Sequence, residues 1–142
     1  MRELLFRGKC EDSDKWVFGL PRRRLRLIDD TWYIDEETAF FSHKIRKETI
    51  GQYTDLRDVN NKKIFEGDIF KFTEPYDGKP IYGVVKYRNT YSELRSHNPC
   101  GFVIEWIDNN GILREDLPYW CDLDLSAEVV GNIYDNPELL EV

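Results

Sequence analysis

The chain has 142 residues, of which 41% are hydrophobic and 14% aromatic, so intrinsic disorder is excluded and one domain spanning residues 1–142 is expected. The net charge of −7 disfavours non-specific attraction to nucleic acid or to an anionic membrane surface. The three cysteines are widely spaced, no apolar run is long enough to span a bilayer, and the N-terminus lacks a signal-peptide core. These features predict a cytoplasmic protein without a disulfide scaffold.

The first fifth of the chain predicts a β-hairpin followed by a run of arginines. Arg2–Phe6 is a strand candidate that Gly8 ends, and Lys15–Leu20 is a second strand that Pro21 interrupts. In the run that follows, Arg22, Arg24 and Arg26 would project from one face of an extended strand.

This run, which also includes Arg23, has two interpretations. Its guanidinium groups could hold phosphates or carboxylates of a partner, because the planar fork of donors matches both anions. Alternatively, the arginines lie on a solvated edge strand, or they contact the acidic surface of this protein or of a sister subunit.

The most informative stretch is Glu48–Phe72, which predicts two strands, a polar turn and a tight corner that begins a third strand. Gly51 inside the first strand is typical of a bulge or of a close backbone approach. Asp58 and its asparagine neighbours supply turn chemistry, and Glu66-Gly67-Asp68 forms the corner. Before this stretch, the sequence predicts a strand at Thr31–Ile34. The pattern is weakest in Thr38–Lys47, for which we expect a short helix or an irregular segment.

The second half predicts more antiparallel strands and a short C-terminal helix. The expected strands are Ile81–Tyr87, Gly101–Ile107, Ile112–Arg114 and Glu128–Tyr134, the last broken by Gly131. Asn109-Asn110-Gly111 predicts a hairpin turn, and Arg88–Pro99 is a long surface loop. In the C-terminal helix, Asn136 would be the N-cap, Pro137 the first residue and Glu138 the acidic first-turn residue. The fold class is therefore mainly β.

One internal echo links the two halves, since Glu48-x-x-Gly51-x-x-x-Asp55 recurs as Glu128-x-x-Gly131-x-x-x-Asp135. It is either one paired carboxylate site to which the two equivalent strands contribute or, with more weight, the same combination of strand, bulge and turn used twice.

Several segments in family order resemble the YopX-like family of phage and prophage proteins. They are MRELLFRGK, Trp16–Gly19, ETIGQYTDLRDVNNKKIFEGDIFKF, Gly83–Val85, Gly101–Trp106 and EVVGNIYDNPELLE. The resemblance covers nearly the whole chain. It implies a mostly β fold, with strongly bent antiparallel sheets forming barrel-like lobes, and self-association. It implies no activity, because the family is one of uncharacterised function.

The candidate chemistry is sparse. Cys100, three residues after His97, is the best nucleophile candidate, but no third group is evident to orient the pair. Glu115-Asp116, Asp122, Asp124 and Glu128 could hold a hard cation, but their spacing matches no calcium loop. We therefore expect no catalytic residue, metal or cofactor.

The leading hypothesis is a non-enzymatic binding or assembly protein that self-associates and binds a host or phage protein. The candidate partner contacts are aromatic and arginine side chains, the types that dominate interfaces: Arg22, Arg24, Arg26, Arg88, Tyr91, Arg95 and Trp120. One alternative is nucleic-acid binding through Arg22–Arg26, and the other is a metal-dependent hydrolase. No membrane partner is expected.

Overall fold

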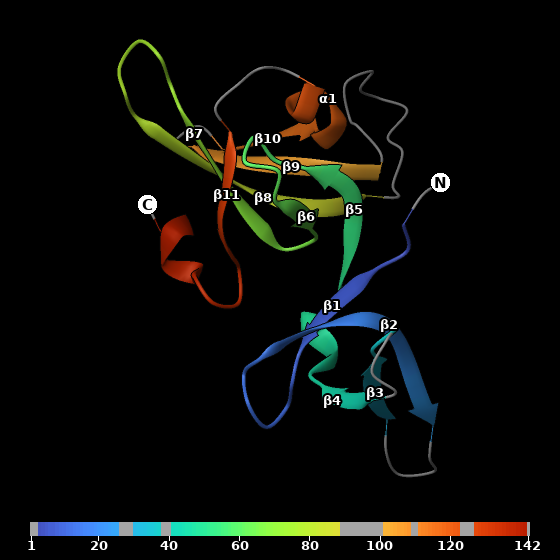
Figure 1. The fold of residues 1–142 in the computed structure, drawn as a ribbon. Helices are drawn as coiled ribbons and strands as arrows, with labels where there is room; N and C mark the ends of the chain where they lie inside the picture. Colours follow the sequence, from blue (N-terminus) through green and yellow to red (C-terminus); the bar gives the residue numbers. More distant parts are fainter. Residues whose placement is uncertain are drawn as a thin grey trace. The chain divides into compact units, whose positions relative to one another are not determined.

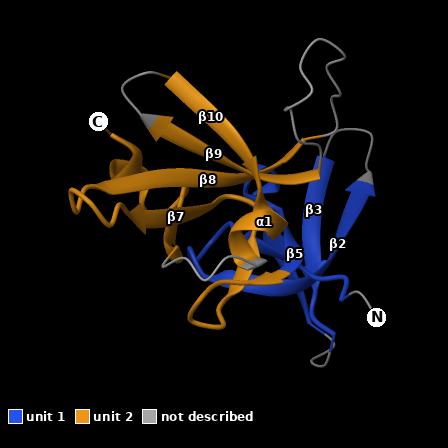
Figure 2. Cartoon of the chain, turned by 90° about the horizontal axis from the view of Figure 1, so that it is seen from above, with its two compact units in different colours: residues 1–55 blue, residues 56–142 orange. Residues whose placement is uncertain are grey.

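The computed structural model describes residues 3–25, 30–37, 41–88, 101–108, 111–122 and 127–141. The chain divides into two compact units, Met1–Asp55 (unit 1) and Leu56–Val142 (unit 2), coloured separately in Figure 2. The predicted mainly β class is confirmed, because the elements in Figure 1 are mostly strands, arranged in two antiparallel sheets. Within the described ranges, no helix has the length and apolar character needed to cross a membrane.

Unit 1 is built from short antiparallel strands around a small core. Its strands are β1 (Phe6–Lys9), β2 (Trp16–Leu25), β3 (Asp30–Asp35), β4 (Ser42–Ile45) and the first part of β5 (Gly51–Arg57). The sheet order is β4-β3-β2-β1-β5-β6, in which β6 (Lys63–Phe65) belongs to unit 2. A 3₁₀ helix, η1 (Lys47–Thr49), connects β4 to β5.

The opening hairpin is confirmed, but two of its predicted limits are wrong. Gly8 lies inside β1 rather than at its end. A Cβ atom at this position would come 3.0 Å from the Cδ1 atoms of Ile34 and Ile45. Pro21 does not interrupt β2 but pairs with Ile34 of β3. A proline is tolerated there because β1 pairs with β2 only as far as Gly19. Arg22, Arg23 and Arg24 are therefore part of a long strand.

The core of unit 1 contains Cys10, Val17, Ile34 and Ile45. A single bridge between Cys10 and Ile45 brings the end of β4 against the chain that follows β1. The sheet order nevertheless remains open, and neither sheet closes into a barrel, so the expected barrel-like lobes are corrected to two open sheets.

Unit 2 contains a five-stranded sheet in the order β10-β9-β8-β7-β11. The strands are β7 (Asp68–Thr73), β8 (Pro80–Arg88), β9 (Gly101–Asp108), β10 (Gly111–Asp116) and β11 (Glu128–Asn132). A short helix, α1 (Leu117–Asp122), lies beside β9 and β10 in Figure 1. The larger core includes Phe70, Val85, Ile104 and Leu117.

The central prediction, two strands followed by a corner and a third strand, is confirmed as β5, β6 and β7. At the corner, Gly67 has a φ of +88°, a conformation that glycine adopts without a Cβ clash. The Asp68 carboxylate accepts a hydrogen bond of 2.8 Å from the backbone N–H of Phe65 and so ties the two strands together.

The C-terminal segment confirms the break at Gly131 and corrects the predicted cap. The pairing of β11 with β7 shifts between Val129 and Gly131, as a bulge requires. The expected helix is the 3₁₀ helix η2 (Pro137–Leu140), with Pro137 at its start. The side chain of Asn136 does not cap it, because its Oδ1 accepts a hydrogen bond from the N–H of Asn132 instead.

Candidate functional site

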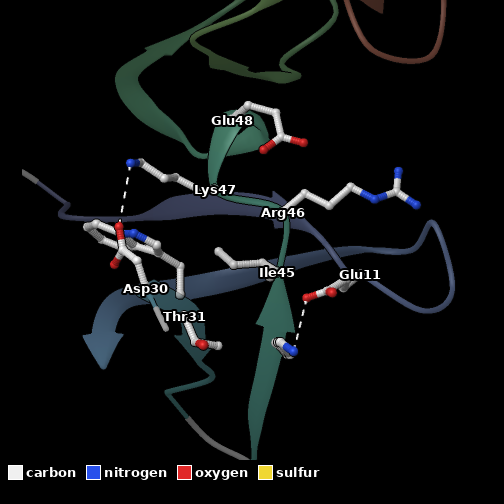
Figure 3. Close-up of a pocket in the computed structure, with 9 residues that line it drawn as sticks. Glu11, Asp30, Thr31, Ile45, Arg46, Lys47 and Glu48 are labelled. Carbon is white, nitrogen blue, oxygen red and sulfur yellow. Dashed lines mark ion pairs between the residues drawn. The ribbon is translucent and has the colours of Figure 1, made fainter. Parts of the chain in front are cut away.

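A pocket of about 460 Å³ lies in unit 1, where the start of β3, the end of β4 and η1 meet (Figure 3). Its lining contains acidic, basic, aromatic and aliphatic side chains: Glu11, Asp30, Thr31, Trp32, Lys44, Ile45, Arg46, Lys47 and Glu48. The volume falls within the roughly 300–1,000 Å³ range of ligand sites.

The strand register explains why these residues meet. Trp32 pairs with Ile45, so both side chains lie on the face of the sheet that carries the unit 1 core. The indole Nε1–H of Trp32 is buried and has no hydrogen-bond partner among the described residues. The pocket therefore has an aromatic wall beside the small core.

Two exposed ion pairs cross the rim of the pocket. Lys47 Nζ lies 3.7 Å from Asp30 Oδ2, and Lys44 Nζ lies 3.5 Å from Glu11 Oε2, as the dashed lines in Figure 3 mark. Arg46, by contrast, makes a short contact of 2.8 Å with Asp14. Both lysine pairs are longer than the usual 2.7–3.2 Å of an N–H···O hydrogen bond, so they are weak and depend mainly on charge attraction.

Asp30 has a second and much closer cationic partner. Arg23 Nε lies 2.6 Å from Asp30 Oδ1. The hydrogen bond from Arg23 lowers the pKa of Asp30, against a smaller opposing effect of desolvation, and Lys47 lowers that pKa further. Asp30 is therefore ionised at neutral pH and is shared by two cations.

The arginine run forms such pairs with its own chain, which agrees with one of the alternatives considered for it. Arg22 contacts the Asp35 carboxylate through Nε at 3.0 Å and Nη2 at 3.4 Å, and it lies 4.9 Å from the ring of Tyr33. The hydrogen bond between them raises the pKa of Arg22 and lowers that of Asp35. Arg24 is exposed and has no ion-pair partner in the described ranges, and Arg26 lies outside them.

The remaining candidate contacts lie in unit 2 or outside the described residues. Arg88 is the last residue of β8, whereas Tyr91 and Arg95 fall in the undescribed 89–100. Trp120 in α1 packs against the core, with its ring centroid 4.8 Å from that of Trp106 and 5.2 Å from that of Phe72. Neither Arg88 nor Trp120 is among the residues that line the pocket.

The residues considered for catalysis or metal binding form no site in the described part of the chain. His97, Cys100 and Asp124 lie outside it, and the side chain of Asp122 is likewise not described. The Glu128 carboxylate accepts a hydrogen bond of 2.9 Å from Asn60 Nδ2. No group of three or more His, Cys, Asp or Glu side chains within the described residues could hold a metal ion.

Sequence reasoning missed most of the pocket. Asp30 lies just before the predicted strand Thr31–Ile34 and was not a candidate site residue, and Lys44 and Lys47 fall in the weakly patterned segment Thr38–Lys47. No local motif marks these residues, because the pairing of β3 with β4 brings them together across a gap in the sequence.

The comparisons with known proteins agree with this fold. No curated protein matches the chain. The crystal structure of protein EF1440 from Enterococcus faecalis is similar, with a TM-score of 0.57 and 21% sequence identity over 99% of this chain and 100% of that chain. At this identity the likeness shows the fold alone. A family model described as YopX protein matches residues 6–141, and the chain therefore belongs to the YopX protein family.

Proposed function

We propose that this protein acts by binding a partner polypeptide, and that the pocket of unit 1 is the contact site. The observation that carries the proposal is the composition of the pocket wall. It combines side chains of both charges, joined in long and exposed ion pairs, with the aromatic surface of Trp32. Exposed pairs of this kind contribute only about 0–1 kcal/mol each, so an entering chain exchanges them at little cost.

A polypeptide suits this wall better than a nucleic acid does. A phosphate backbone is uniformly negative and would meet the carboxylates of Glu11, Asp30 and Glu48. A polypeptide offers both charges as well as neutral amide groups. The nucleic-acid alternative is further weakened because Arg22 and Arg23 already hold Asp35 and Asp30. The phage or prophage origin that the family resemblance implies remains a prediction.

A peptide-display selection tests this proposal. Peptides enriched on the wild-type protein are measured by fluorescence anisotropy against Thr31→Trp, which places a large ring at the pocket lining. Thr73→Trp is the matched control, since Thr73 is an exposed strand residue of β7 in unit 2. We expect binding to be lost in Thr31→Trp and kept in the control. Failure to enrich any peptide, or equal binding by both variants, would contradict the proposal.

Self-association is a second proposal, and the edge strand β10 favours it. β10 ends the order of its sheet, and its neighbouring residues Ile112 and Leu113 are 56% and 58% exposed. Because successive residues of a strand point to opposite faces, the edge is apolar on both. Sheet edges are usually protected by charge. In β10 the charges follow the apolar pair: Arg114 is bound to Glu105 of β9 at 3.1 Å, and Glu115 and Asp116 end the strand.

The edge of β10 suits a second copy of the chain in antiparallel pairing. A register centred on Leu113 places the two Leu113 side chains together and sets Ile112 opposite Arg114, so that no like charges meet. Light scattering over a range of concentrations should show a dimer that Leu113→Lys abolishes. Val59→Lys, at a residue that is 57% exposed in a turn, should leave it intact. A wild-type protein that stays monomeric throughout would refute this proposal.

A further inference from the structure

The cluster of Arg23, Asp30 and Lys47 contains two cations and one carboxylate, so it carries one positive charge in excess at the edge of the pocket. The two cations are not held equally. Arg23 makes a short, charge-assisted hydrogen bond of 2.6 Å, whereas Lys47 lies 3.7 Å away and its side chain is 66% exposed. Lys47 is therefore the member of the cluster that is available to another anion.

Moving Lys47 to a new partner would leave no charge unpaired. Asp30 keeps Arg23 at 2.6 Å when Lys47 turns away. The carboxylate of the next residue, Glu48, does not lie beside the Lys47 ammonium group, because the two side chains extend in opposite directions from η1 in Figure 3. The other rim lysine, Lys44, differs, since its departure would leave Glu11 without that partner.

Beside Lys47, the pocket offers the aromatic surface of Trp32, which is only partly buried, whereas Ile45 belongs to the core. We propose that the pocket binds a carboxylate group of the partner polypeptide on Lys47, with the neighbouring part of that chain against Trp32. The inference rests on the proposed polypeptide binding and adds the chemical group that is recognised. A glutamate or aspartate side chain and a C-terminal carboxylate share this chemistry.

Isotope-edited NMR separates these sources. The probes are the capped peptides Ac-Gly-Glu-Gly-NH₂ and Ac-Gly-Gln-Gly-NH₂, together with Ac-Gly-Gly-Gly carrying a free C-terminus. The readout is the shift of the Trp32 indole N–H and of the backbone N–H groups of Lys47–Thr49. We expect one or both carboxylate-bearing peptides to shift these signals and the glutamine peptide to leave them in place.

Four variants link that binding to the excess charge. Lys47→Gln should weaken binding about tenfold, which corresponds to about 1.4 kcal/mol, and Lys47→Arg should restore it. Lys62→Gln removes the same charge from an exposed residue of unit 2 and should change nothing. Asp30→Asn should tighten binding several-fold, because it releases Lys47 and Arg23 together, an effect that a purely structural Asp30 would not produce.

The outcomes distinguish this inference from the proposal on which it rests. Shifts with the glutamine peptide as large as those with both carboxylate-bearing peptides would overturn carboxylate recognition while leaving polypeptide binding intact. Unchanged binding in Lys47→Gln, or weaker binding in a folded Asp30→Asn, would also overturn it. If no displayed or capped peptide binds at all, both proposals fail.

Discussion

At the scale of single residues, the buried carboxylate of Asp58, in the turn between β5 and β6, accepts three backbone hydrogen bonds. The donors are the backbone N–H groups of Asn60, Lys62 and Val129, at 2.9, 2.8 and 3.0 Å. It therefore ties the turn to β11, which follows it by about seventy residues. The sequence predicted the turn, but it contained no sign of the bond to β11.

Replacing Asp58 with alanine should lower the free energy of unfolding by roughly 3 kcal/mol, because buried donors would lose a charged acceptor. Urea denaturation measures the change. Asp77→Ala is the control, since the Asp77 carboxylate accepts one bond from the N–H of Lys79 in an exposed turn, and its loss should cost well under half as much. Equal losses would show that burial and the bond to β11 do not matter.

The ion pair of Arg22 and Asp35 makes a prediction about pH. The hydrogen bond from Arg22 lowers the pKa of Asp35 in the folded protein, so the pair stabilises the fold above about pH 4. That contribution is lost as the pH falls through the lowered pKa. In Arg22→Gln, a carbon-13 NMR titration should find the pKa of Asp35 closer to about 3.9. Arg24→Gln, on the same strand face, should leave it unchanged.

At the scale of elements, the bulge in β11 depends on glycine at position 131, because a side chain there would meet its neighbours. A Cβ atom at Gly131 would come 2.4 Å from Oδ1 and 2.7 Å from Cγ of Asn136. The same Oδ1 accepts the N–H of Asn132, so Asn136 cannot move away without breaking that bond. The bulge and the start of η2 are therefore coupled.

Gly131→Ala should destabilise the protein by about 1–3 kcal/mol, the usual cost of forcing extra atoms into a packed site. In an Asn136→Ala background the same substitution should cost clearly less, because the two closest contacts, with Oδ1 and Cγ of Asn136, are removed. A double-mutant cycle by urea denaturation measures the coupling. A coupling energy of zero would show that the close approach is not the reason for glycine at this position.

Elements with strong local signals could be predicted from the sequence. The block Glu48–Phe72 predicted β5, the turn, the corner and β7, because Asp, Asn and Gly determine backbone geometry locally. α1 was missed, since its six residues, Leu117–Asp122, are too few to show a helical period. The pocket was missed because strand register, which no short motif encodes, sets Trp32 opposite Ile45 and so brings the start of β3 to the end of β4.

At the scale of the whole molecule, each unit has its own hydrophobic core, and β5 passes from one unit to the other without a linker. The length of the chain predicts one domain. If this prediction is right, the two cores should unfold together, because a strand cannot separate in its middle without losing its ladder.

Matched core substitutions test the single domain. Ile34→Val in unit 1 and Ile104→Val in unit 2 each remove one methylene group from a fully buried side chain. Each should cost about 0.5–1.5 kcal/mol and lower the Tm of one shared calorimetric transition by a few degrees. Two transitions, each moved by only one of the substitutions, would instead indicate two independent domains.

The contact between Trp106 and Trp120 also has a spectroscopic consequence. Two indole rings with centroids 4.8 Å apart and planes inclined by 55° couple their electronic transitions. Such a pair gives a two-signed circular dichroism band that vanishes when the rings separate. The other two tryptophans, Trp16 and Trp32, both lie in unit 1. Unit 2 therefore contains an intrinsic optical reporter, and the loss of its native packing can be followed without any added label.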